Sequence, residues 1–284
     1  MSAEVINGKD LAHKLRAGMK EEVSQLNKNG VIPHLTVVLV GEDPASKSYV
    51  NGKRKASEET GISSQIIELP STATEEELLQ LIAKLNNDDS VHGILVQLPL
   101  PKHIREQQVI EAIDPAKDVD GFHPVNIGRM MTGKDTFLPC TPFGILTMLK
   151  SNNIPIEGSH AVIIGRSNIV GKPVGQLLLN ENATVTYCHS KTKDLKQITT
   201  KADILIVAVG KANIIGKDYL KQDAVVIDVG VNRLDNGKLT GDVDFEDAKE
   251  IASYITPVPK GVGPMTITML LKNTIKAARG LSEN

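Results

Sequence analysis

The stretch SHAVIIGRSNIVGKPVGQLLLNENATVTYC, residues 159–188, decides the fold class. It begins with an apolar run that ends at Gly165, passes through a turn into a segment of helical spacing, and ends in a second apolar run. The turn has the spacing G-x-S-x-x-x-G, with Gly165, Ser167 and Gly171, which differs from the strict G-x-G-x-x-G pattern. Small residues there let the backbone approach a pyrophosphate at a helix N-terminus. The stretch therefore indicates a dinucleotide-binding unit, and a tight turn without a ligand is the alternative.

The residues after the second run indicate which dinucleotide is bound. A carboxylate about 20 positions after the glycine motif usually binds the ribose 2′-hydroxyl. Here His189, Ser190 and Lys191 follow the strand, and Arg166 lies in the turn. Hydroxyl and cationic side chains without a carboxylate suit a phosphate, which favours NADP over NAD. His189 is either catalytic or a polar residue at the end of the strand.

Two further apolar runs, residues 203–210 and 224–232, complete a predicted four-stranded Rossmann-like sheet. Segments rich in Gly and Pro, residues 114–144 and 256–266, lie on either side of this unit and are predicted connectors. We therefore predict a dinucleotide domain over 141–263. The substrate domain would comprise 1–140, completed by a final helix over 264–284 that returns to it, with a cleft between the two domains.

Upstream of the first connector, strands and helices alternate. Apolar runs at 35–40, 65–70 and 91–101 are predicted strands, and segments of helical spacing at 8–28, 43–61, 72–88 and 106–113 are predicted helices. Thr74 and Glu77 have the spacing of a capping box. The pattern is typical of an α/β domain with a mostly parallel sheet.

The predicted helix over 43–61, DPASKSYVNGKRKASEETG, carries a candidate catalytic pair. Tyr49 and Lys53 are four residues apart and project from one face. A phenol and an amine could orient and protonate a heterocycle if burial lowers the amine pKa from ~10.4 toward ~7–8. The alternative is a solvated basic face with Tyr49 packed on the core. Gly52 between them indicates that another element packs closely on the helix.

Gln97 and the sequence KDVDG extend this candidate site. Gln97 ends the strand over 91–101, and ligands of α/β sheets bind at the carboxyl ends of strands. It is otherwise a simple strand-end residue. Asp118 and Asp120 are separated by one residue. They form an Asx-type turn, or one of them accepts hydrogen bonds from a donor-rich ligand; metal binding is a third alternative.

Composition excludes several classes of protein. The chain has 284 residues, 40% apolar and 23% charged, which suits a globular protein of two domains. A net charge of −2 gives no reason to expect nucleic acid or an anionic membrane as partner. Cys140 and Cys188 form neither a disulfide framework nor a metal cluster. The N-terminus lacks the apolar segment of a secretory signal, so we expect a cytoplasmic protein.

Taken together, these residues resemble the bifunctional methylenetetrahydrofolate dehydrogenase/cyclohydrolase family over nearly the whole chain. The resemblance implies oxidation of 5,10-methylenetetrahydrofolate by NADP, hydrolysis of the methenyl product to 10-formyltetrahydrofolate, and a homodimer. The motifs that carry it are YVNGK (49–53), VQLPLP (96–101), KDVDGFHPVNIGR (117–129), PCTPFG (139–144), GRSNIVGKPV (165–174), CHSKT (188–192) and PVPKGVGPMT (257–266).

The resemblance also implies roles for individual residues. Lys53 moves protons in the hydrolytic step, Tyr49 stacks on the folate, Gln97 supports the lysine and Asp120 holds the pterin ring. No metal is implied. One departure is Lys260, which stands where the family commonly has glycine. The implied folate-binding residues are Tyr49, Val50, Asn51, Gly52, Lys53, Val96, Gln97, Leu98, Pro99, Pro259, Lys260, Gly261, Val262 and Gly263, and the implied cofactor-binding residues are Gly165, Arg166, Ser167, Ser190 and Val231.

Three alternatives stay open at this point. A two-domain amino-acid or hydroxy-acid dehydrogenase would share the Rossmann unit but leaves the set of Tyr49, Lys53 and Asp120 without a role. A non-catalytic nucleotide sensor would bind NADP without turnover. A family member that has lost one of its two activities is the third.

Overall fold

The computed structural model describes residues 2–282 and contains two compact units. The six-stranded unit comprises the residues up to Ala12 and Thr141–Thr266. The three-stranded unit comprises His13–Cys140 and the residues from Ile267 onward. The residues up to Ala12, which the sequence places in the substrate domain, thus group with the six-stranded unit, because strand β1 pairs with β11.

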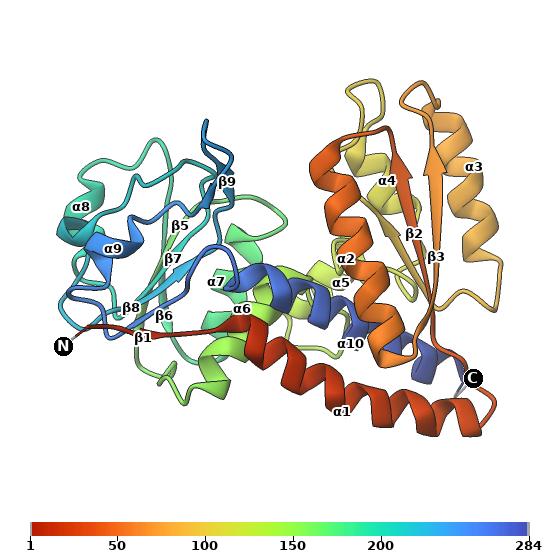
Figure 1. Ribbon diagram of the computed structural model, residues 1–284, viewed down its shortest axis with the longest axis horizontal. Coiled ribbons are helices and arrows are strands. Elements are labelled where there is room, and N and C mark those ends of the chain that lie inside the picture. Colours follow the sequence, from red (N-terminus) through yellow and green to blue (C-terminus); the bar gives the residue numbers. More distant parts are fainter. Residues whose placement is uncertain (1, 283–284) are drawn as a thin grey trace. The chain divides into compact units, whose positions relative to one another are not determined.

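The six-stranded unit is built on a parallel sheet with the order β1-β11-β8-β7-β5-β6 (Figure 1). The four predicted strands are present. The sequence missed β1 and β11, because strands of two residues carry no periodicity. The strands are β1 (Glu4–Val5), β5 (His160–Ile164), β6 (Thr184–Cys188), β7 (Ile204–Val207), β8 (Val225–Asp228) and β11 (Tyr254–Ile255), and an antiparallel pair, β9 (Asn232–Arg233) and β10 (Leu239–Thr240), follows β8.

One face of this sheet is covered by a buried apolar cluster. Side chains of β5, β7, β8 and β11, such as Val162, Leu205 and Val226, pack with Ala248 of a short helix. Such strands, buried on both faces, are typical of parallel sheets. The helices of the unit are α6 (Cys140–Ser151), which belongs to it from Thr141 onward, α7 (Gly171–Asn180), α8 (Leu195–Thr199), α9 (Phe245–Ala248) and the 3₁₀ turn η1 (Lys217–Tyr219).

The three-stranded unit has a parallel sheet with the order β3-β2-β4. An apolar cluster between this sheet and α3 and α4 buries one face, including Val38, Ile82 and Ile94. Gly93, on the opposite face of β4, lies against Thr274 of α10. The elements are β2 (His34–Val40), α2 (Pro44–Thr60), β3 (Ser63–Leu69), α3 (Glu75–Asn86), β4 (Gly93–Val96), α4 (Glu106–Ala112) and α5 (Pro124–Met131); α1 (Gly8–Lys28) and α10 (Val262–Ser282) have residues in both units.

Local signals fix the ends of two helices. The Asp43 carboxylate accepts a hydrogen bond from the Ser46 amide at 2.8 Å at the start of α2, and Gly61 ends that helix with φ 79°. Thr74 and Glu77 form the predicted capping box of α3. These contacts set the direction of α2, which carries Tyr49 and Lys53.

The predicted connector over 114–144 is not irregular throughout. It contains α5, and α6 begins within it. The His123 side chain caps α5 and Pro124 occupies its first turn, so the proline that suggested a connector instead begins a helix. Only two residues of α5, Asn126 and Met130, are buried, which is too few for a recognisable periodicity.

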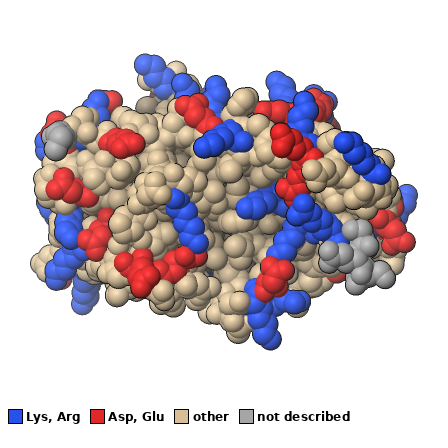
Figure 2. All heavy atoms as spheres, turned by 90° about the horizontal axis from the view of Figure 1, so that it is seen from below, with Lys and Arg blue, Asp and Glu red and all other residues tan. Residues whose placement is uncertain are grey.

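Surface charge agrees with the small net charge. On the face drawn in Figure 2, lysine and arginine side chains are interspersed with aspartate and glutamate. In the part of the chain that the structure describes, no helix is long and apolar enough to cross a membrane.

Candidate functional site

Lys53 is a buried lysine on α2, with 7% of its surface exposed. Its Nζ donates a hydrogen bond to Gln97 Oε1 at 2.8 Å, and Gln97 Nε2 donates to the carbonyl of Leu98 at 2.7 Å. The second bond holds the amide with its oxygen toward the lysine. Burial lowers the pKa of Lys53, and the charges of Asp120 and Cys140 oppose this effect. A solvated position is therefore excluded for Lys53.

Tyr49 is accessible one turn before Lys53 on α2. Its side chain is 42% exposed, so it is not packed in the core. Gly52, between the two, lies against α10, where an added Cβ would be 3.3 Å from Ile267 Cδ1. The close packing that the glycine indicates is thus present.

The two carboxylates of KDVDG have different surroundings. Asp118 accepts hydrogen bonds from the amides of Phe122 and His123 at 3.3 and 2.8 Å and from Asn126 Nδ2 at 2.8 Å, and so holds the turn that leads to α5. Burial raises its pKa to about 6. Burial also raises the pKa of Asp120, against the charge of Lys53. Asp118 thus forms the turn, and Asp120 is the carboxyl near the lysine.

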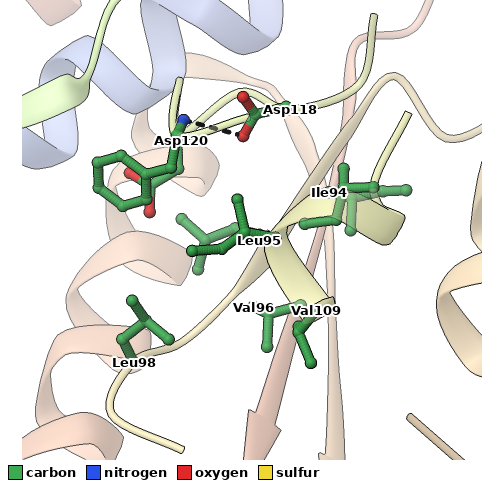
Figure 3. Close-up of a pocket in the computed structure, with 10 residues that line it drawn as sticks. Ile94, Leu95, Val96, Leu98, Val109, Asp118 and Asp120 are labelled. Carbon is green, nitrogen blue, oxygen red and sulfur yellow. Dashed lines mark hydrogen bonds between the residues drawn. The ribbon is translucent and has the colours of Figure 1, made fainter. Parts of the chain in front are cut away.

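A small pocket lies at the carboxyl end of β4, next to Asp120 (Figure 3). In Figure 3, Asp118 and Asp120 lie on one side of it, and Leu98, Val96 and Val109 lie on the other. This pocket is little larger than a water molecule, so it is a packing gap beside Asp120 and not a site for a heterocycle. Its lining residues are Ile94, Leu95, Val96, Leu98, Val109, Ile110, Ile113, Asp118, Asp120 and Phe122.

Two residues that support this site were missed from the sequence. The Cys140 thiol is buried beside Asp120 and Lys53, and burial raises its pKa well above the usual value. Asn273 Nδ2 donates to the carbonyls of Val119 at 2.9 Å and Leu138 at 3.0 Å, which fixes the chain next to Asp120. The PCTPFG motif includes Cys140, whereas Asn273 is 154 positions from Val119 and has no local signal.

The glycine turn after β5 forms a cradle that only small residues allow. Gly165 has φ 137°, and a side chain there would overlap the carbonyl of Ala208. A Cβ at Gly171 would be 2.5 Å from the Gly165 carbonyl oxygen. Gly175, which the sequence did not single out, packs α7 on Tyr187 of β6. These glycines provide the tight turn, the close approach and the helix–strand contact of a dinucleotide site.

The other predicted cofactor residues lie on the surface of the six-stranded unit. Arg166, Ser167 and Ser190 are exposed, and Val231 is 47% exposed. Ser167 Oγ accepts hydrogen bonds from the amides of Val170 and Gly171, each at 3.2 Å, so it also holds the turn that leads into α7. This donor set and the glycine cradle fit a phosphorylated dinucleotide.

His189 lies in the turn after β6. Its Nδ1 accepts a hydrogen bond from the Lys191 amide at 3.1 Å, and its own amide donates to Thr192 Oγ1 at 2.8 Å. These contacts agree with a polar residue at the end of the strand.

The loop Pro259–Gly263 is fixed to the first turn of α1. The Lys9 amide donates to the Lys260 carbonyl at 3.0 Å, and Lys260 has φ 85°, a left-handed conformation. Of the other implied folate-binding residues, Asn51 and Pro99 are exposed and Leu98 and Gly263 are half-buried, whereas Val50, Val96, Gly261 and Val262 are buried. A buried valine can offer a ligand its backbone but not its side chain.

The fold and these sites define a two-unit α/β enzyme with a dinucleotide cradle in one unit and a buried lysine in the other. Family models match both parts: "Tetrahydrofolate dehydrogenase/cyclohydrolase, catalytic domain" matches residues 6–120, and the "NAD(P)-binding domain" of the same family matches residues 139–281. The chain belongs to the tetrahydrofolate dehydrogenase/cyclohydrolase family.

Individual relatives agree with this assignment. The chain is 69% identical over 281 residues to the bifunctional protein FolD of Oceanobacillus iheyensis, covering 99% of each chain. The Campylobacter jejuni FolD structure has a TM-score of 0.97 and 52% identity, covering 98% of this chain and 99% of that one. The Trypanosoma brucei FolD structure, a complex with NADP and an inhibitor, has a TM-score of 0.96 and 37% identity and covers 100% of both chains.

The predicted family, enzyme class and two-domain α/β fold are therefore confirmed. The alternatives of an amino-acid or hydroxy-acid dehydrogenase and of a non-catalytic sensor are set aside. The roles predicted for individual residues stay predictions.

Proposed function

We propose that Lys53 is the proton-transfer group of a single folate site in the three-stranded unit. The chain is an NADP-dependent methylenetetrahydrofolate dehydrogenase and methenyltetrahydrofolate cyclohydrolase. The observation that carries the proposal for Lys53 is its burial against a neutral partner, Gln97, at 2.8 Å. An amide positions the amine without stabilising its charged form as a carboxylate would.

The oxidation step is a hydride transfer and needs no general acid or base from the protein. NADP, when bound, accepts the hydride from the methylene carbon of the substrate. The product is a delocalised iminium cation, so the protein must orient the substrate rather than remove a proton. We assign this orientation to Tyr49, through stacking, and to Asp120, through hydrogen bonds to the pterin.

The hydrolytic step needs a base and then an acid. The neutral Lys53 amine removes a proton from the water whose oxygen bonds to the methenyl carbon. The C–N5 bond then breaks as the lysine ammonium gives a proton to N5, which leaves 10-formyltetrahydrofolate and the neutral amine. A second proton, from the added hydroxyl, goes to solvent, so the cation and water give the formyl product and one proton. A depressed pKa suits both roles.

The test is Lys53→Met, with Lys55→Met as the matched control. Lys55 is an exposed lysine on the same helix. We expect Lys53→Met to abolish hydrolysis of methenyltetrahydrofolate, since one general acid–base group contributes typically ~10²–10⁴-fold. Lys55→Met should retain it. In the wild type, the rate should rise with pH as Lys53 loses its proton and level off well below the pH at which an exposed lysine titrates, because burial lowers its pKa. Full hydrolysis by Lys53→Met would remove Lys53 from this role.

NADP specificity is assigned to Arg166, Ser190 and Lys191. All three are exposed, and Arg166 and Ser190 follow β5 and β6, two neighbouring strands. In this assignment the 2′-phosphate binds at the carboxyl ends of β5 and β6. Arg166→Ala should then raise the KM for NADP about tenfold, as expected for the loss of a charge-assisted hydrogen bond. The KM for NAD should change little. An equal effect on both dinucleotides would contradict the assignment.

The proposed assembly is a homodimer in the cytoplasm that acts on one-carbon derivatives of tetrahydrofolate. Support for the dimer comes from β6, which ends the sheet order, and from Leu179 and Tyr187 near it, which are 52% and 42% exposed. Light scattering should give about twice the chain mass of 30.6 kDa. A monomer mass would contradict the dimer. Activity in the membrane pellet rather than the soluble fraction of a cell lysate would contradict the location.

We also assign the two functions to the two units. The folate chemistry belongs to the unit that holds Lys53, completed by α10, and dinucleotide binding to the unit that holds Gly165. If Lys53→Met loses hydrolysis and Arg166→Ala loses only NADP-dependent oxidation, the two functions are assigned to separate units. Loss of both activities in every such variant would contradict the division.

A further inference from the structure

Two buried carboxyl groups in the six-stranded unit have no part in the chemistry described so far. Asp228, at the end of β8, is 3% exposed, and Asp242, just after β10, is 0% exposed. Buried carboxyl groups are retained in a fold only where hydrogen bonds compensate their desolvation. The partners of these two groups are therefore informative.

Asp242 gathers donors from two separate loops. Its carboxyl group accepts hydrogen bonds from the amides of Val209, Gly210 and Lys211 at 2.7, 3.0 and 2.8 Å. It also accepts one from Asn232 Nδ2 at 2.9 Å. Consecutive amides that converge in this way form an anion-binding concavity. Here the anion is a side chain of the protein itself, so the concavity is a structural joint.

Asp228 in turn fixes Asp242. It accepts hydrogen bonds from the amides of Asp242 and Val243 at 3.0 and 2.9 Å and from the amide of Gly230 at 3.0 Å. A side chain at Gly230 would overlap the Asp242 carboxyl group, and one at Gly241 would overlap that of Asp228. The two carboxyl groups and the two glycines thus form a close-packed cluster in which neither glycine position has room for a side chain.

The loops joined by Asp242 lie where a dinucleotide binds. They follow β7 and β8, and ligands of parallel sheets bind at the carboxyl ends of strands. The Gly165 cradle touches Ala208, which immediately precedes the first of these loops. Since the phosphate-bearing ribose belongs at the end of β6, on the other side of β5, the second half of the dinucleotide extends over β7 and β8.

Val231 is an exposed apolar residue of the loop after β8. It is 47% exposed, yet the residues on both sides of it are held: the Gly230 amide by Asp228 and the Asn232 side chain by Asp242. A rigid, exposed apolar residue between two fixed neighbours is suited to contact a flat ring. The two carboxyl groups hold the residues on both sides of it, together with the pairing of Asn232 with Thr240 and the bond from the Val229 amide to the Val207 carbonyl.

We propose that Asp242, held by Asp228, is a positioning residue for the nicotinamide half of NADP. It fixes the loops after β7 and β8 relative to each other and so places Val231 against the ring. The proposal rests on the proposed NADP-dependent oxidation and extends it to residues that do not touch the cofactor.

The test is Asp242→Asn, with Asp235→Asn as the matched control. The amide offers one acceptor oxygen and places N–H groups among backbone N–H donors, so at least one of the four bonds is lost. Asp235 is an exposed aspartate in the turn between β9 and β10. Each variant is assayed for NADPH formation at varied NADP, and for hydrolysis of methenyltetrahydrofolate without any dinucleotide.

We expect kcat/KM for NADP to fall about tenfold or more in Asp242→Asn, as a lost hydrogen bond to a charged group predicts. The rate of hydrolysis and the KM for the folate should stay within about twofold of the wild type, because mutations at distant, independent sites affect each other by no more than that. Asp235→Asn should match the wild type throughout. An unchanged kcat/KM for NADP would overturn the proposal. A parallel loss of hydrolysis would also overturn it, since that result indicates general damage.

Asn232→Ala serves if Asp242→Asn does not fold. It removes one of the four hydrogen bonds and leaves the three backbone bonds of Asp242 in place. The same separation of the two activities, smaller in size, is the expected result, and its absence would overturn the proposal. No NADPH formation by the wild-type protein would instead contradict the proposed function itself.

Discussion

Lys260 adopts a backbone conformation that suits glycine rather than lysine. Its φ of 85° lies in the left-handed region, where a Cβ costs roughly 1–2 kcal/mol. The sequence marks this position as a departure from the family, which commonly has glycine there, and the dihedral angle explains why glycine is preferred. The hydrogen bond from the Lys9 amide to its carbonyl holds the loop in place in spite of the strain.

Lys260→Gly should therefore stabilise the protein. Relief of the left-handed conformation outweighs the greater chain entropy of glycine when unfolded, for a net gain of about 0.5–1 kcal/mol. Urea denaturation checks the free energy of unfolding. The matched control is Lys260→Ala, which removes the charge but keeps the Cβ and should leave stability nearly unchanged. If Lys260→Ala gained as much unfolding free energy as Lys260→Gly, loss of the charge and not relief of backbone strain would be responsible.

At the level of single residues, the sequence predicts the side chains of the site better than their supports. Tyr49 and Lys53 share one turn of one helix, so helical spacing alone places them together. Gln97 follows from the rule that ligands bind at strand ends, and its bond to Lys53 confirms that the two meet. Asn273 has no such rule, because a contact across 154 positions depends on the complete fold.

At the level of elements, β4 and the Asp118–Asp120 segment lie together beside the proposed folate site. Ile94 pairs with Asp118 in a parallel bridge, and Gly93 lies against Val119. A Cβ at Gly93 would be 2.8 and 2.9 Å from the two methyl carbons of Val119, which is itself fully buried. The absence of a side chain at Gly93 thus sets how closely Asp120 approaches the strand.

Gly93→Ala should displace this segment. Overpacking of this kind costs typically ~1–3 kcal/mol of stability, and the movement of Asp120 should reduce both activities. Thermal unfolding and the two assays check the prediction. Gly93→Ala combined with Val119→Ala removes the overlapping methyl groups and should recover part of the activity. Failure of the double variant to exceed Gly93→Ala in activity would contradict a steric cause.

Most elements could be predicted from the sequence, and the exceptions have physical reasons. The long helices and the buried strands carry clear periodicity, and α1 has the predicted bounds of 8–28. β4 is shorter than the apolar run that predicted it, ending at Val96 rather than 101, since two prolines follow and proline cannot donate to a ladder. α5 was missed because its capping histidine and its first-turn proline resemble a loop sequence.

At the level of the whole molecule, each unit is assembled from two separate segments of the chain. The sequence predicts one of these divisions, the return of the final helix to the three-stranded unit, because two connectors lie on either side of the dinucleotide unit. It does not predict the other, since the first residues join the six-stranded sheet through only the two pairs of β1 with β11. Short pairings of this kind leave no pattern in the sequence.

The return of α10 to the three-stranded unit has a consequence for the order of synthesis. Residues 13–140 leave the ribosome before most of the other unit, but Ile267, which packs on Gly52, and Asn273, which fixes the chain beside Asp120, follow after all of it. Both segments of the six-stranded unit are thus synthesised before the second segment of the three-stranded unit. The proposed lysine site is therefore completed by residues that are synthesised after every residue of the six-stranded unit.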